Sequence, residues 1–132
     1  MKAGENIARL LDRGSILALC GPLGAGKTIL VKGIARFFEI KEEITSPTYT
    51  IVSEYEGIKD GKTFEFFHID AYRLKGCDDF LASGGEEYLY GKGIVIIEWA
   101  DRIAGVLPPG TLTVRMETGE ENNRLISIYG DP

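Results

Sequence analysis

Apolar side chains recur at helical spacing at the start of the chain and then give way to a short continuous run. Residues Lys2 to Leu11 show the helical pattern, and Asp12-Arg13-Gly14 is typical of the end of a helix. The run from Ser15 to Cys20 is short, apolar and followed by a glycine, which predicts a buried strand. We therefore expect a helix, a turn and a buried strand in that order.

A glycine-rich segment, Gly21 to Gly26, separates this strand from a second amphipathic helix that extends to Phe38. The apolar stripe expected on that helix consists of Ile29, Leu30, Ile34 and Phe37. The order of strand, glycine loop and helix is the first indication of an α/β fold.

The rest of the chain is dominated by short extended patterns. The expected strands are Tyr49 to Tyr55, Thr63 to Ile69, Gly93 to Ile97, Leu112 to Glu117 and Leu125 to Tyr129, with a helical stretch at Asp79 to Tyr90. No internal repeat or linker divides the sequence. We predict one α/β domain over residues 1–132, with a mixed, strand-rich sheet flanked by helices.

The amino-acid composition limits the classes of protein to which this chain can belong. With 44% apolar and 27% charged residues, the 132-residue chain is typical of a folded globular protein, and no apolar stretch approaches the roughly 20 residues of a membrane helix. The two cysteines are too few for a disulfide scaffold and the first residues lack the apolar core of a signal peptide, so we expect a cytoplasmic protein. The net charge of −5 opposes direct binding to a nucleic acid backbone.

The strongest motif is Gly21-Pro22-Leu23-Gly24-Ala25-Gly26-Lys27-Thr28, which fits G-x-x-x-x-G-K-[ST] in full. Backbone N–H groups from Gly21, Gly24, Ala25 and Gly26 converge on a phosphate in such a loop, and the following helix N-terminus favours the same anion. Lys27 then meets the β- and γ-phosphates, and the Thr28 hydroxyl is a ligand for Mg²⁺. The motif predicts a P-loop NTPase fold that binds the phosphates of a nucleotide together with Mg²⁺.

Phosphoryl chemistry also needs a carboxylate at the carboxyl end of a neighbouring buried strand. Glu98 follows a continuous aliphatic run, whereas Phe66, His68 and Asp70 share one face of an alternating strand. Either acid is placed to reach the phosphates, and the aliphatic run favours Glu98. On its own, His68 is expected to be a hydrogen-bonded structural residue.

Other nucleotide-binding classes fit less well. A regulatory GTPase would need an Asn-Lys-x-Asp segment and an Asp-x-x-Gly switch, and neither occurs at a suitable place. A small-molecule kinase usually closes an arginine-rich lid over the phosphate, whereas the arginines after the loop are dispersed. The interpretation as a kinase is therefore weakened but stays open. A third interpretation also stays open, a binding module that nucleotide holds in one conformation and that does not require turnover.

Three further segments accompany the phosphate loop in one order: Ser46-Pro47-Thr48-Tyr49-Thr50, His68-Ile69-Asp70-Ala71-Tyr72-Arg73-Leu74 and Glu98-Trp99. Together they resemble the TsaE family of bacterial ATPases over nearly the whole chain. The resemblance implies slow ATP hydrolysis and a role in the threonylcarbamoyl modification of adenosine 37 in tRNA. It also implies action on a TsaD–TsaB complex, with tRNA contacted only through that complex.

The resemblance also implies roles for individual residues. It makes Thr28 and Glu98 the magnesium ligands and Lys27 the phosphate lysine, while Thr48 is switch-like near the γ-phosphate and Asp70 positions the hydrolytic water. Trp99 and Arg124 become contacts to nucleotide or partner. Family members usually begin with a strand and a Thr-containing segment that helps hold adenine, whereas this sequence starts within the first predicted helix, so we expect a base pocket that is either incomplete or built differently.

Overall fold

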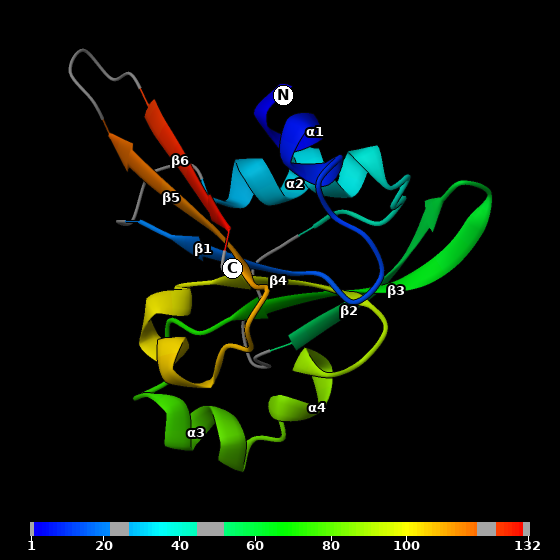
Figure 1. Ribbon diagram of the computed structural model, residues 1–132. Coiled ribbons are helices and arrows are strands. Elements are labelled where there is room, and N and C mark those ends of the chain that lie inside the picture. The colour runs from blue at the N-terminus through cyan, green and yellow to red at the C-terminus, as the bar shows by residue number, and fades with distance from the viewer. Residues whose placement is uncertain (1, 22–26, 45–51, 119–123, 131–132) are drawn as a thin grey trace.

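The computed structural model describes residues 2–21, 27–44, 52–118 and 124–130. Its elements in chain order are α1 (Lys2–Ala8), β1 (Ile16–Cys20), α2 (Lys27–Phe37), β2 (Val52–Lys59), β3 (Lys62–Asp70), α3 (Cys77–Ala82), α4 (Glu86–Leu89), β4 (Ile94–Glu98), the 3₁₀ helix η1 (Ala100–Val106), β5 (Leu112–Thr118) and β6 (Arg124–Gly130). Helices α1 and α2 cover one face of the sheet, and α3 and α4 lie on the other (Figure 1).

The six strands form one mixed sheet in the order β2-β3-β4-β1-β5-β6. Strands β3, β4, β1 and β5 run parallel, and the two edge strands, β2 and β6, are antiparallel to their neighbours. This confirms the prediction of an α/β P-loop fold with a mixed, strand-rich sheet. Because the four central strands are parallel, their carboxyl ends meet at one edge of the sheet.

Two apolar layers hold the sheet in place. Leu17 and Leu19 of β1 pack in the layer under α1 and α2, and the alternate residues Ile16, Ala18 and Cys20 pack in the layer on the other face. A central parallel strand is buried on both faces, which is why its sequence reads as a continuous apolar run.

Helix α1 is held unusually close to α2. A Cβ atom on Gly4 would lie 2.9 Å from the Cα atom of Gly33, so the two backbones meet only because neither residue has a side chain. Helix α1 therefore packs directly against α2 on the same face of the sheet.

Two predictions about helices were wrong. The helix expected over Asp79 to Tyr90 is divided into α3 and α4, because Gly84 adopts a left-handed conformation with φ of 82° between them. Ile29 does not belong to the buried stripe of α2; it is 49% exposed, and Leu30, Val31 and Ile34 face the core instead. No described helix is long and apolar enough to cross a membrane.

Candidate functional site

The candidate site lies where the parallel strands end. Cys20, Asp70 and Glu98 are the last residues of β1, β3 and β4, and α2 begins at Lys27. Asp70 pairs with Glu98 in the parallel register, and Glu98 pairs with Leu19, which belongs to the layer under α1 and α2. Paired residues of parallel strands project from the same face, so both carboxylates belong to the face that α2 covers. This edge is where open α/β sheets bind ligands.

Gly21 directs the chain out of β1 into the phosphate loop. Its φ is 143°, and a Cβ atom there would clash with the main-chain carbonyl oxygen of Met116 on β5. Only glycine fits both conditions without displacing the sheet. The other predicted loop contacts, Gly24, Ala25 and Gly26, lie outside the described residues.

Lys27 is buried at the first turn of α2, with 5% of its surface exposed. Its Nζ atom donates a hydrogen bond to the Gly21 carbonyl oxygen at 2.7 Å and lies 3.3 Å from the centre of the Trp99 ring. Burial lowers the pKa of Lys27, and the negative charges of Glu98, Asp101 and Asp70 oppose that shift. A buried cation on which three carboxylates act is therefore already in place at the start of α2.

Glu98 is buried at the end of β4 and is paired with a histidine. Its Oε2 atom lies 2.6 Å from the Nε2 atom of His68, and both side chains are almost fully enclosed. The expectation that His68 is a hydrogen-bonded residue is confirmed, but sequence reasoning did not identify Glu98 as its partner. The position of His68 two residues before Asp70, on the same strand face, was the available signal.

Asp70 ends β3 and starts a turn. Its Oδ1 atom accepts a hydrogen bond of 2.9 Å from the backbone N–H of Tyr72, an arrangement that stabilises the turn. The carboxylate is half-buried, and its charge acts on Lys27. The structure thus gives Asp70 a local structural contact at the same place where a catalytic role was predicted.

Trp99 connects the buried lysine to the surface. It has a left-handed backbone with φ of 59° and ψ of 37°, which is strained for a bulky residue. Its ring centre lies 4.9 Å from that of Tyr72, which is 49% exposed, and the guanidinium of Arg102 lies 5.3 Å from the Tyr72 ring. Trp99 was predicted from the sequence as a contact residue, but Tyr72 was not identified as its neighbour.

Two of the remaining predicted site residues, Thr28 and Arg124, have a defined position in the fold. Thr28 is the second residue of α2 and is half-buried. The backbone of Arg124 pairs with Thr118 at the end of β5, on the edge of the sheet that also carries the phosphate loop. Thr48 lies outside the described residues.

The donor groups at this edge are consistent with magnesium. Thr28 offers a hydroxyl, and Glu98 offers its Oε1 atom, since Oε2 is paired with His68. Within the described ranges no three His, Cys, Asp or Glu side chains gather closely enough to bind a metal by themselves. This fits Mg²⁺, which proteins usually hold through one or two side chains together with phosphate oxygens and water.

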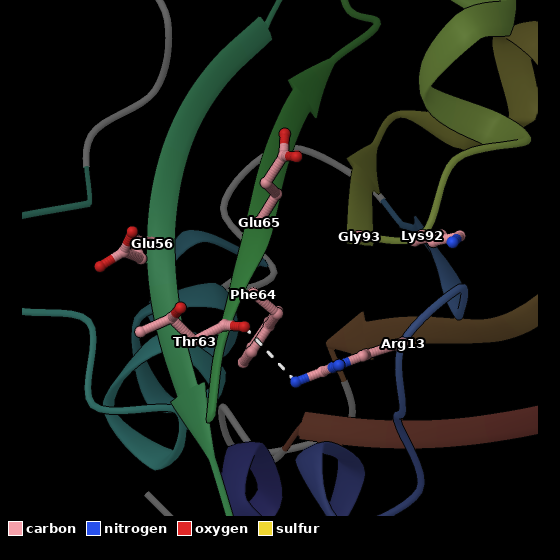
Figure 2. A pocket seen from close by; sticks show the side chains of 7 residues that line it. All are labelled: Arg13, Glu56, Thr63, Phe64, Glu65, Lys92 and Gly93. Carbon is pink, nitrogen blue, oxygen red and sulfur yellow. Dashed lines mark hydrogen bonds between the residues drawn. The ribbon is translucent and has the colours of Figure 1, made fainter. Parts of the chain in front are cut away.

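A separate cavity of about 330 Å³ lies near the opposite ends of the parallel strands, lined by residues that include Arg13, Phe64 and Lys92 (Figure 2). Arg13 reaches across it and donates a hydrogen bond of 3.4 Å to the main-chain oxygen of Thr63. The cavity lies at the amino ends of β3 and β4, away from the edge where α/β sheets bind nucleotides.

Comparison with known proteins identifies the family of this chain. Residues 1–126 match the family model described as threonylcarbamoyl adenosine biosynthesis protein TsaE. The chain is 42% identical to a Treponema pallidum protein named tRNA threonylcarbamoyladenosine biosynthesis protein TsaE, over 95% of this chain and 89% of that protein. A protein of the same name from Aquifex aeolicus is 38% identical, with coverage of 97% and 86%.

A solved structure shares the fold. The crystal structure of Bacillus subtilis YdiB superimposes with a TM-score of 0.74 at 31% identity, covering 99% of this chain and 78% of that one. The family match, the two relatives and the shared fold all extend over almost the entire chain. The chain therefore belongs to the TsaE family, the proteins of tRNA threonylcarbamoyladenosine biosynthesis.

Proposed function

We propose that this protein binds ATP with Mg²⁺ and hydrolyses it slowly as an accessory protein of tRNA threonylcarbamoyladenosine biosynthesis. The observation that supports this most strongly is the buried Lys27 at the start of α2, on whose ammonium the negative charges of Glu98 and Asp70 act. A cation at a helix N-terminus next to a glycine loop suits the β- and γ-phosphates of a nucleotide.

Each side chain then has a distinct role. Lys27 leaves the Gly21 carbonyl and binds phosphate oxygens, while Thr28 and Glu98 hold Mg²⁺, which neutralises charge on the phosphates when it is bound. Asp70 orients the water that attacks the γ-phosphate. On the strength of the family resemblance alone, Thr48 is a proposed switch-like residue near the γ-phosphate and Arg124 is a proposed contact to nucleotide or partner.

A partner completes the site in this proposal. Slow intrinsic turnover follows from the dispersed arginines, because little cationic charge is available to stabilise the transition state. We assign that role to a TsaD–TsaB-type complex, and the exposed Tyr72 beside Trp99 offers a surface that senses the state of Lys27. With a net charge of −5, the isolated chain is expected to meet tRNA only through this complex.

The first experiment is equilibrium binding of ATP, ADP and GTP to the purified protein with and without Mg²⁺. The Lys27→Ala variant should bind ATP about tenfold to a hundredfold more weakly, the range expected for losing a charged hydrogen-bond donor. Lys32→Ala is the matched control, since Lys32 is exposed on the same helix. A preference for GTP, or equal ATP affinity in both variants, would contradict the proposed site.

The second experiment measures ATPase rates with and without a TsaD–TsaB-type complex. The complex should raise the rate, by up to about 10³-fold if it supplies an arginine. Trp99→Ala should lose the increase while retaining nucleotide binding, and Tyr90→Ala, which removes an exposed aromatic side chain, should keep it. If the complex is shown to form and the rates are equal with and without it, the partner mechanism is eliminated. The proposal that the protein hydrolyses ATP would not be affected.

A further inference from the structure

The buried pair of His68 and Glu98 joins two neighbouring strands at the end of the sheet. The two side chains are 0% and 4% exposed, and 2.6 Å separates Nε2 from Oε2. Because a carboxylate accepts hydrogen bonds and does not donate them, the Nε2–H group of His68 is the donor. Such a short hydrogen bond to a carboxylate is of the strong, charge-assisted kind.

The imidazole has no other polar contact among the described residues, since its Nδ1 atom is buried without a hydrogen-bond partner there. His68 lies on β3 between the apolar Phe67 and Ile69, and Phe66 on its own strand face is fully buried. An apolar side chain would avoid the cost of enclosing a ring nitrogen at this position. The polar interaction of this histidine is therefore directed entirely at Glu98.

The register explains what this contact achieves. His68 pairs with Ile96 and Asp70 pairs with Glu98, so the imidazole lies one step back along the sheet from the two carboxylates. By binding Oε2 from behind, it restrains the Glu98 side chain and leaves Oε1 for the ligand side of the site. Of the acidic groups that act on the Lys27 ammonium, Glu98 acts most strongly, so without that restraint the ammonium is a competing attraction for the carboxylate.

We propose that His68 is a positioning residue that orients Glu98 for magnesium, an inference that rests on the proposed ATP-binding function. Partners of metal ligands in other proteins change metal affinity by about tenfold to a hundredfold when they are removed. The same range is expected here for the Mg²⁺ concentration that half-saturates nucleotide binding. Affinity for nucleotide in the absence of Mg²⁺ should not change.

The test titrates Mg²⁺ into each protein with a fluorescent ATP analogue and follows binding, with EDTA samples as the metal-free reference. His68→Gln carries an amide N–H near the position of Nε2, whereas His68→Asn is too short to reach Glu98 and His68→Leu has no donor. Phe66→Leu is the matched control for core damage, because Phe66 is buried on the same strand face. Melting temperatures are measured for all variants.

We expect His68→Asn and His68→Leu to raise the half-saturating Mg²⁺ concentration about tenfold to a hundredfold, and His68→Gln to stay close to the wild-type value. His68→Leu should have no additional effect in a Glu98→Gln background, since the two residues act through one contact. If His68→Leu does not fold, the Gln and Asn variants decide the question.

Two results would overturn the inference while leaving the proposed function intact. One is that the His68 variants and Phe66→Leu lower the melting temperature alike with no change in Mg²⁺ dependence. The other is that no His68 variant folds although Phe66→Leu does, which assigns the histidine a purely structural role. A wild-type protein whose nucleotide binding is absent or indifferent to Mg²⁺ would instead refute the proposed function, and the inference with it.

Discussion

The ammonium group of Lys27 lies 3.3 Å from the centre of the Trp99 ring, within the range of a strong cation–π contact. The same group donates to the carbonyl of Gly21 at 2.7 Å. Both contacts use the positive charge that the proposed function directs to a phosphate. If nucleotide binds as proposed, these contacts are exchanged for others, and we expect the change to reach Trp99 and its neighbour Tyr72.

This exchange predicts an optical signal. Trp99 is the sole tryptophan in the sequence, so its fluorescence reports on one site. Adding ATP with Mg²⁺ should change the emission because the ammonium leaves the ring. Lys27→Met without nucleotide should already show the altered emission, while Lys32→Met should behave as the wild type. Identical spectra for Lys27→Met and the wild-type protein would show that the contact does not exist in solution.

Asp70 has a structural contact in the turn and a proposed catalytic role, and one substitution can separate the two. Asp70→Asn keeps an Oδ1 acceptor for the backbone N–H of Tyr72 but removes the negative charge. We expect the variant to fold and bind ATP, and to hydrolyse it about 10²-fold more slowly or worse, as expected for loss of a general base. The measurement is single-turnover hydrolysis beside a binding titration.

Asp101→Asn is the control for Asp70→Asn, because Asp101 also places negative charge near Lys27 but lies outside the strand end. If Asp70→Asn hydrolyses ATP at the wild-type rate, the role of Asp70 is limited to stabilising the turn. If tRNA modification survives complete loss of hydrolysis, nucleotide acts only by locking a conformation for the partner.

Gly21, the residue that follows β1, should not tolerate replacement by a residue with a side chain. Gly21→Ala combines an unfavourable φ of 143° with a clash against the Met116 carbonyl, and is expected to cost about 2–5 kcal/mol in free energy of unfolding. Gly14→Ala, with φ of 87° and open space around it, should cost only about 1–2 kcal/mol. Urea unfolding of both variants checks the difference, and equal losses would refute the close approach of β1 and β5.

The two cysteines should differ in reactivity. Cys20 is buried at the end of β1, and that burial raises the pKa of its thiol, so less of the nucleophilic thiolate is present at pH 8. Cys77 is half-buried at the start of α3. Iodoacetamide followed by mass spectrometry should label Cys77 first and Cys20 only after unfolding. Equal labelling rates in the folded protein would contradict the burial of Cys20.

Local patterns in the sequence were sufficient for most of the fold. The strand ending at Cys20, the glycine loop and the helix beginning at Lys27 were predicted because each has its own periodicity and a glycine boundary. Helix α2 shows the limit of such patterns. Ile29 fits a helical stripe, but which stripe faces the sheet depends on how the helix is rotated against it, and that rotation is decided by packing.

The sequence by itself determined the proposed chemistry, since the phosphate-loop motif and the acidic residues Asp70 and Glu98 are the kinds of group that a nucleotide and its metal require. Only the tertiary structure decided which of these groups touch. The contacts of Lys27 with Trp99 and of His68 with Glu98 join residues 72 and 30 positions apart, and they arise because parallel strands bring distant carboxyl ends to one edge. Periodicity describes a single element, whereas such contacts depend on strand order and register, which no local pattern contains.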